Sequence, residues 1–117
     1  MLDLSFRVTK DTTRARQEEI IRRMRVAYET YAVTNPYRES PRFPPIMIEA
    51  FPSDRPYTEH GTIRGALWLG EKVLDRWTQN AVKAVMRALL EEFPDRGVSF
   101  LYDNDGSALK LQPKRSR

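Results

Sequence analysis

The sequence predicts an α+β fold, a ferredoxin-like split β-α-β sandwich with the element order β-α-β-β-α-β-β. Five short segments alternate or concentrate apolar residues as strands do, and two long segments repeat them every three or four residues as helices do. A helix that connects two strands of one sheet makes a right-handed crossover, so both helices should cover one face of a mainly antiparallel five-stranded sheet. The expected strands are 2–8, 46–51, 62–69, 98–102 and 107–112, and the expected helices are 13–33 and 71–93.

The first strand and helix have clear local signals. Residues 2–8 alternate apolar and polar side chains, which predicts a strand with one face on a core and one near water. One apolar stripe runs along residues 13–33, and Asp11, Thr12 or Thr13 can accept from the free backbone N–H groups at its start. This segment should therefore be an amphipathic helix packed on the sheet.

Arginine is frequent on the polar side of the first helix. Glu18 precedes Arg22 by four residues and Glu19 precedes Arg23 by four, which is the favourable order for ion pairs on a helix. We interpret this side as a solvated helix face, with a binding face as the alternative.

Two unusual loops flank the second strand. Residues 34–45 contain four prolines together with Tyr and Arg residues, and 52–61 again combines Pro, Arg and Tyr. Proline stiffens a loop and removes backbone donors. We expect the second loop to join strands 46–51 and 62–69 as a long hairpin, and long ordered loops are enriched in function.

The second helix is expected to be the principal core helix. Apolar residues cover a wide arc of 71–93, and Trp77 on that arc is interpreted as a core anchor. Glu91 and Glu92 lie at its end, where we expect a solvated terminus.

The chain is expected to form one domain over residues 1–112. Residues 98–102 and 107–112 predict a terminal hairpin that extends the sheet, and 113–117 predict a disordered basic tail. The whole chain has 117 residues, which is within the usual size of one domain.

Composition excludes several classes of function. There is no cysteine and only one histidine, which excludes disulfide scaffolds, thiol catalysis and a structural zinc site. No apolar run is long enough to span a bilayer, and no leader precedes the first strand, so a cytoplasmic protein without membrane contact is expected. The net charge of +4 comes largely from Lys114, Arg115 and Arg117, and the rest of the chain is almost neutral.

No catalytic motif or cofactor site is recognisable. The glycines are scattered rather than grouped into a phosphate-binding loop, and no cofactor is expected. His60 has Glu59, Asp54 and Asp11 as potential partners in general-base catalysis, but proximity in sequence does not supply the required geometry. We therefore favour a protein that is not an enzyme.

The favoured function is a protein-binding module, such as an inhibitor, an immunity protein that neutralises a toxin, or an adaptor. It would act through loops 34–45 and 52–61, through the open sheet face, or through both, and self-association as a homodimer is a variant of the same idea. Tyr, Trp and Arg in exposed positions are typical of binding hot spots. The candidate partner-binding residues are Tyr37, Arg38, Arg42, Phe43, Arg55, Tyr57, His60, Arg64 and Trp68.

Two alternatives stay open. A nucleic-acid-binding protein of this topology would stack bases on aromatic residues of the open sheet face, where only Trp68 with Arg64 is suitable. A small-molecule-binding dimeric α+β barrel would enclose a pocket lined by Trp68, Met47 and Phe51, with Arg64 or His60 as its polar group.

Overall fold

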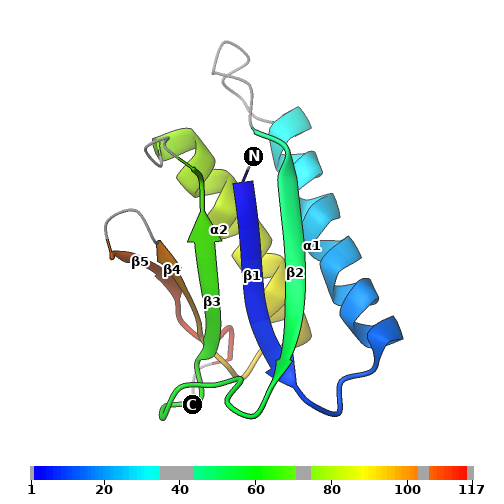
Figure 1. The fold of residues 1–117 in the computed structure, drawn as a ribbon. Coiled ribbons are helices and arrows are strands. Elements are labelled where there is room, and N and C mark those ends of the chain that lie inside the picture. Colours follow the sequence, from blue (N-terminus) through cyan, green and yellow to red (C-terminus); the bar gives the residue numbers. More distant parts are fainter. Residues whose placement is uncertain (1, 35–43, 71–74, 103–105, 116–117) are drawn as a thin grey trace.

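The computed structural model describes residues 2–34, 44–70, 75–102 and 106–115 (Figure 1). They form two helices and a five-stranded mixed sheet, in the element order expected from the sequence. The strands are β1 (Leu2–Thr9), β2 (Ile46–Ser53), β3 (Ile63–Trp68), β4 (Val98–Tyr102) and β5 (Ala108–Leu111), and the helices are α1 (Arg14–Thr34) and α2 (Arg76–Glu92). The α+β class is confirmed.

The order of the strands corrects the expected split topology. The sheet runs β2-β1-β3-β4-β5, with β1 parallel to β2 and β3 parallel to β4. The pairs β1/β3 and β4/β5 are antiparallel, so the sheet is mixed rather than mainly antiparallel. In a split β-α-β unit another strand separates the two strands that a helix connects. Here each helix connects direct neighbours, and two complete β-α-β units lie side by side. Apolar alternation is the same for either arrangement, and so it could not distinguish them.

The same strand order shows that the expected hairpin between β2 and β3 is wrong. β1 lies between these two strands, so the connection after β2 passes the end of β1 before it reaches β3 (Figure 1). Its second half folds back on β3: Thr58 N donates to Thr62 O at 2.8 Å, and Tyr57 forms a bridge with Ile63. The loop is long because it must pass the end of β1 to reach β3.

Both helices lie on one side of the sheet, and the other side is open (Figure 1). The alternation of β1 places Leu2, Leu4, Phe6 and Val8 under the helices, each no more than 3% exposed. They pack with apolar residues of α1, α2 and the other strands in one core. This burial explains the alternation that predicted the strand.

Both helices begin at capping residues. Thr13 Oγ1 accepts from the backbone N–H of Arg16 at 3.1 Å, as expected for α1. For α2, Asp75 has an extended backbone and its carboxylate accepts from Thr78 N at 2.7 Å. The cap explains why the described part of this helix begins at Arg76. The earlier part of the expected helix, residues 71–74, lies outside the described residues.

Gly65 of β3 is a site of very close packing. A Cβ atom built on it would lie 2.1 Å from Cδ1 of Phe100 on the neighbouring strand and 2.9 Å from the carbonyl oxygen of Ser5. The ring of Phe100 is completely buried. This part of the core therefore requires a residue without a side chain at position 65.

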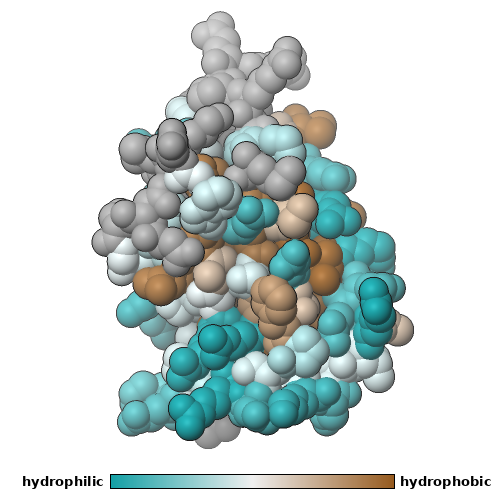
Figure 2. All heavy atoms as spheres, viewed as in Figure 1, coloured by the Kyte–Doolittle hydropathy of each residue, from teal (hydrophilic) through white to brown (hydrophobic). Residues whose placement is uncertain are grey.

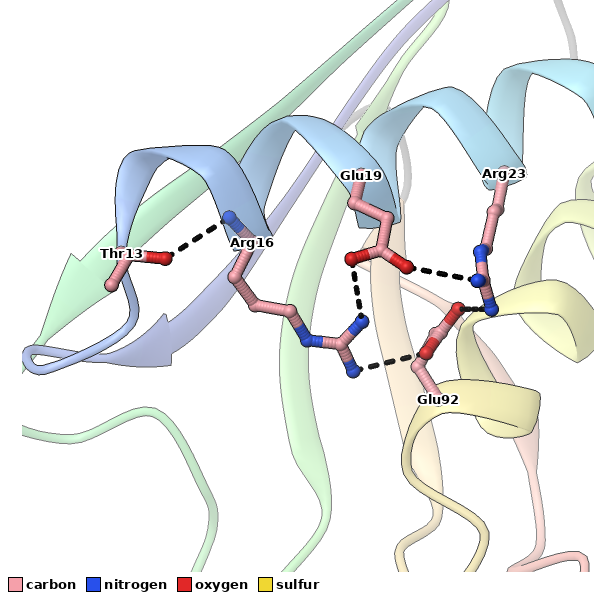
Figure 3. A network of polar contacts seen from close by, with 5 residues as sticks. All are labelled: Thr13, Arg16, Glu19, Arg23 and Glu92. Atoms are coloured by element: carbon pink, nitrogen blue, oxygen red, sulfur yellow. Dashed lines mark hydrogen bonds and ion pairs between the residues drawn. The ribbon is translucent and has the colours of Figure 1, made fainter.

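Glu92 is a buried junction between the helices, and its expected role as a solvated helix end is wrong. Its side chain is 8% exposed and binds two arginines of α1, Arg16 at 2.9 Å and Arg23 at 2.6 Å (Figure 3). Glu19 completes the cluster, 2.8 Å from Arg23 and 3.6 Å from Arg16. Part of the arginine-rich side of α1 thus binds α2.

The described part of the expected tail lies against the body of the protein. Arg115 N donates to the carbonyl oxygen of Pro94 at 2.9 Å, and Lys114 forms an ion pair with Glu91. Within the described ranges, neither helix combines the length and apolar character that a transmembrane helix requires.

Tyr28 connects α1 to the chain before β2. It is 4% exposed, and its hydroxyl donates to the carbonyl oxygen of Pro44 at 2.5 Å. Burial raises the pKa of Tyr28 to about 12, and the negative charge of Asp75 contributes in the same direction. Its neutral form is therefore favoured by the folded state.

Tyr28 should make stability depend on pH above about pH 10. An unfolded tyrosine loses its proton near pH 10, whereas Tyr28 keeps it until about pH 12 in the folded protein. Its contribution is complete below pH 10 and should fall by about 1.4 kcal/mol per pH unit as pH rises through this window. Urea unfolding from pH 9 to pH 12 should show a steeper decline for the wild type than for Tyr28→Phe. Parallel declines would contradict this prediction.

Candidate functional site

The open face of the sheet carries an apolar patch. Among the residues that the structure describes, six large apolar side chains are exposed, and four of them lie on this face. They are Met47, Phe51, Trp68 and Leu101, each 43 to 49% exposed. Figure 2 shows brown atoms in the middle of this face, with teal atoms below them and to their right. A sheet face that contacts only water would not require large exposed apolar side chains.

The strand register arranges the open face in three rows that run across the strands. The upper row is Met47, Asp3 and Trp68. The middle row is Glu49, Ser5, Ala66, Leu101 and Ala108. The lower row contains Phe51 beside Arg7, and Arg64 beside Ser99 and Lys110. The last β1/β3 pair is Phe6 with Gly65, and the next position in the same register places Arg7 beside Arg64. These two residues therefore belong to one row.

Charge is distributed unevenly over these rows. The acidic residues Asp3 and Glu49 lie in the upper and middle rows, whereas the cations Arg7, Arg64 and Lys110 share the lower row. In the part of the chain that the structure describes, none of these five side chains forms an ion pair. The upper and middle rows of the face therefore carry negative charge and the lower row carries positive charge.

A shallow hollow of about 490 Å³ lies over the middle and lower rows. Small residues, including Ser5, Ala66 and Ser99, form the floor of the hollow, and the larger side chains of Phe51 and Leu101 also line it. Its lining also includes Arg7, Arg64 and Thr58. The hollow offers space for side chains of a partner between two guanidinium groups and two apolar groups.

The loop after β2 positions Arg64 on this face. Arg64 Nε donates to the carbonyl oxygen of Tyr57 at 3.3 Å, and its backbone N–H donates to Pro56 O at 3.2 Å. The ring of Tyr57 is covered by Arg96, whose guanidinium carbon lies 3.6 Å from the ring centroid. Arg96 also donates to Gly61 O at 3.1 Å. The loop is thus attached to the sheet.

The predicted site residues do not form one group. Arg64 and Trp68 lie on the open face, in different rows, while Tyr57 packs under Arg96. Arg55 is exposed on the loop, and His60 lies in a separate hollow beside Arg96. Tyr37, Arg38, Arg42 and Phe43 lie outside the described residues.

His60 has no catalytic partner among the described residues. No described side chain hydrogen-bonds to its ring, and two of its suggested carboxylate partners are engaged elsewhere. Asp11 accepts from Thr9 at 2.6 Å, and Asp54 pairs with Lys10 at 2.7 Å. The described residues also contain no group of three potential metal ligands.

The residues expected to line a small-molecule pocket do not share one hollow of the single chain. Phe51 and Arg64 line the hollow on the open face, but Met47 and Trp68 lie outside its lining, in the upper row. His60 belongs to the other hollow.

Several residues of the open face were absent from the predicted site. Leu101, Lys110 and Arg7 all point outward by strand alternation, which was a usable signal for each of them. Alternation does not show which strands are neighbours, and so it could not place them in rows.

Comparison with models of protein families, with curated proteins and with solved structures finds no match. The functional argument therefore depends on the side chains of this chain.

Proposed function

We propose that the protein is a non-enzymatic protein-binding module and that its binding surface is the open face of the sheet. The observation that carries this proposal is the group formed by Met47, Phe51, Trp68 and Leu101 on that face. Interfaces are enriched in aromatic residues, Met and Arg, and exposed apolar patches mark interaction sites. The inhibitor, immunity and adaptor roles expected from the sequence are all roles of this kind.

The composition of the face favours protein over nucleic acid as the partner. Three cations share the lower row, but Asp3 and Glu49 lie on the same surface and would repel phosphate. Trp68 and Phe51 lie in opposite rows of the face. A base-stacking surface would place its aromatic residues together on neighbouring strands.

Trp68→Ala should weaken protein binding by about 30-fold or more, because truncation of a Trp that is a binding hot spot costs about 2 kcal/mol or more. Tagged protein would be incubated with a lysate of the source cells and an untagged copy, with and without nuclease. Captured proteins would be quantified by mass spectrometry. We expect a stoichiometric protein partner, either a different protein or the untagged copy, that nuclease does not remove.

Val33→Ala is the matched control, since Val33 is an exposed apolar residue of α1 away from the open face. It should leave capture unchanged, and circular dichroism should show equal helicity for both variants. Recovery that collapses with nuclease would support nucleic-acid binding instead. Capture that Trp68→Ala does not alter would refute the open face as the binding surface.

A further inference from the structure

We propose that the partner on the open face is the same face of a second copy, related by a two-fold axis that runs across the strands. This inference rests on the proposed function and names the partner of that same surface. The arrangement is isologous, so every contact between different residues occurs twice.

The charge pattern selects the direction of the axis. An axis parallel to the strands would place the lower row of one copy on the lower row of the other, with the order of the strands reversed. With this axis over the central strand β3, Arg64 would face its own counterpart, and Arg7 and Lys110 would face Ser99 and Phe51. The cations of both copies would then share one band with no acidic residue opposite them. An axis across the strands, through the middle row, places the upper row of each copy on the lower row of the other. Like charges across an interface cost several kcal/mol, so the second arrangement is favoured.

In this arrangement the face is complementary to itself. Each strand faces its own counterpart with its direction reversed, so Asp3 of one copy faces Arg7 of the other. Trp68 faces Arg64, which allows the guanidinium group to stack on the indole ring. On β2, Met47 faces Phe51, which buries two half-exposed apolar groups against each other.

The middle row allows the two sheets to approach. Ser5 and Ala66 at its centre are small, and sheets that pack face to face lie about 10 Å apart with strands crossing at about 30°. Glu49 faces its own counterpart, but it lies on the edge strand β2, where it can remain in contact with water. The unfavourable Glu49 pair therefore lies at the edge of the interface, whereas the contacts of Asp3 with Arg7 and of Trp68 with Arg64 lie on the inner strands β1 and β3.

The size of the face predicts a dimer of moderate affinity. Five strands at about 4.8 Å spacing and about 17 Å of strand length give a flat area on the order of 400 Å² per copy. Standard specific interfaces bury about 800 Å² of accessible surface per partner. Side chains enlarge the accessible area beyond the flat area, so we expect a small interface and dissociation at micromolar concentrations.

Charge reversal with sedimentation velocity tests the arrangement. The wild type should show a concentration-dependent equilibrium between monomer and dimer. Asp3→Arg and Arg7→Asp should each weaken the dimer more than about tenfold, because each places like charges together at both symmetric sites. The double variant restores opposite charges at both sites and should dimerise again. A mixture of the two single variants should form a heterodimer for the same reason.

Arg22→Asp is the control, since Arg22 is an exposed residue of α1 that forms no ion pair with the described residues. It should leave the dimer unchanged. The chain contains no cysteine, so Ser5→Cys provides a second readout that leaves the charges unchanged. A thiol-reactive cross-linker about 10 Å long should link two copies through this position, and Arg22→Cys should remain uncoupled.

The failure of this inference differs from failure of the proposed function. A wild type that stays monomeric would overturn the self-complementary arrangement. So would a dimer whose affinity is unchanged by Asp3→Arg and Arg7→Asp and that is not cross-linked through Ser5→Cys. Capture of a different protein in a manner that requires Trp68 would then leave the proposed function in place. A monomer together with capture that is insensitive to Trp68 would overturn both.

Discussion

Gly65→Ala is expected to destabilise the fold by about 3 kcal/mol, near the upper end of the range for overpacking in a core. The new Cβ atom would overlap the ring of Phe100 at 2.1 Å and press on the Ser5 carbonyl at 2.9 Å. Phe100 is completely buried, and the close packing of a protein core limits how far its ring can move. Urea unfolding should show a lower midpoint with an unchanged slope.

A double-mutant cycle separates this clash from a general effect of β3. In a Phe100→Leu background the ring is absent, so Gly65→Ala should cost less than it does in the wild type. Part of the cost should persist, because the Ser5 carbonyl oxygen remains close. Equal costs in the two backgrounds would show that the ring of Phe100 is not what excludes a side chain at position 65.

Glu92→Gln should lower the free energy of unfolding by about 2 kcal/mol. Removal of one partner from a buried ion pair costs about 3 to 5 kcal/mol, and exposed pairs contribute about 1 kcal/mol or less. Glu92 is 8% exposed, but Arg16 and Arg23 are 36% and 51% exposed, so an intermediate loss is expected. Without the carboxylate, Glu19 alone would compensate the two guanidinium groups (Figure 3).

Glu91→Gln is the matched control for this position. Glu91 is the preceding residue of the same helix, and its ion pair with Lys114 is between exposed side chains. Its loss should cost less than about 0.5 kcal/mol, as is typical of surface pairs. Urea unfolding of the two variants in the same buffer compares them directly. Similar losses for Glu91→Gln and Glu92→Gln would contradict a special role for the buried junction.

Local patterns predicted the secondary structure well. Residues 2–8 alternate because one face of β1 is buried under both helices, and this burial is a direct consequence of strand geometry. Thr13 was among the capping candidates for α1 and does accept from Arg16 N. Asp75 was not identified as a cap for α2, although its type is a preferred capping residue.

The candidate site was predicted only in part. Arg64 and Trp68 were placed on the open face from the alternation of β3, and both lie there. Their relation to Asp3, Arg7 and Phe51 depends on β1 lying between β2 and β3, which the expected split topology did not contain. The three rows, and the separation of charge between them, exist only when the strand order is known.

The sequence by itself determined the element order, the class of fold and the sides of β1 and β3 that face the core, because these depend on the period of a local pattern. Only the tertiary structure decided which strands are neighbours, that Glu92 binds two arginines of another helix, and that Phe100 fills the space above Gly65. These features join residues that are distant in the sequence, and their energies come from packing and charge burial, which no local period records.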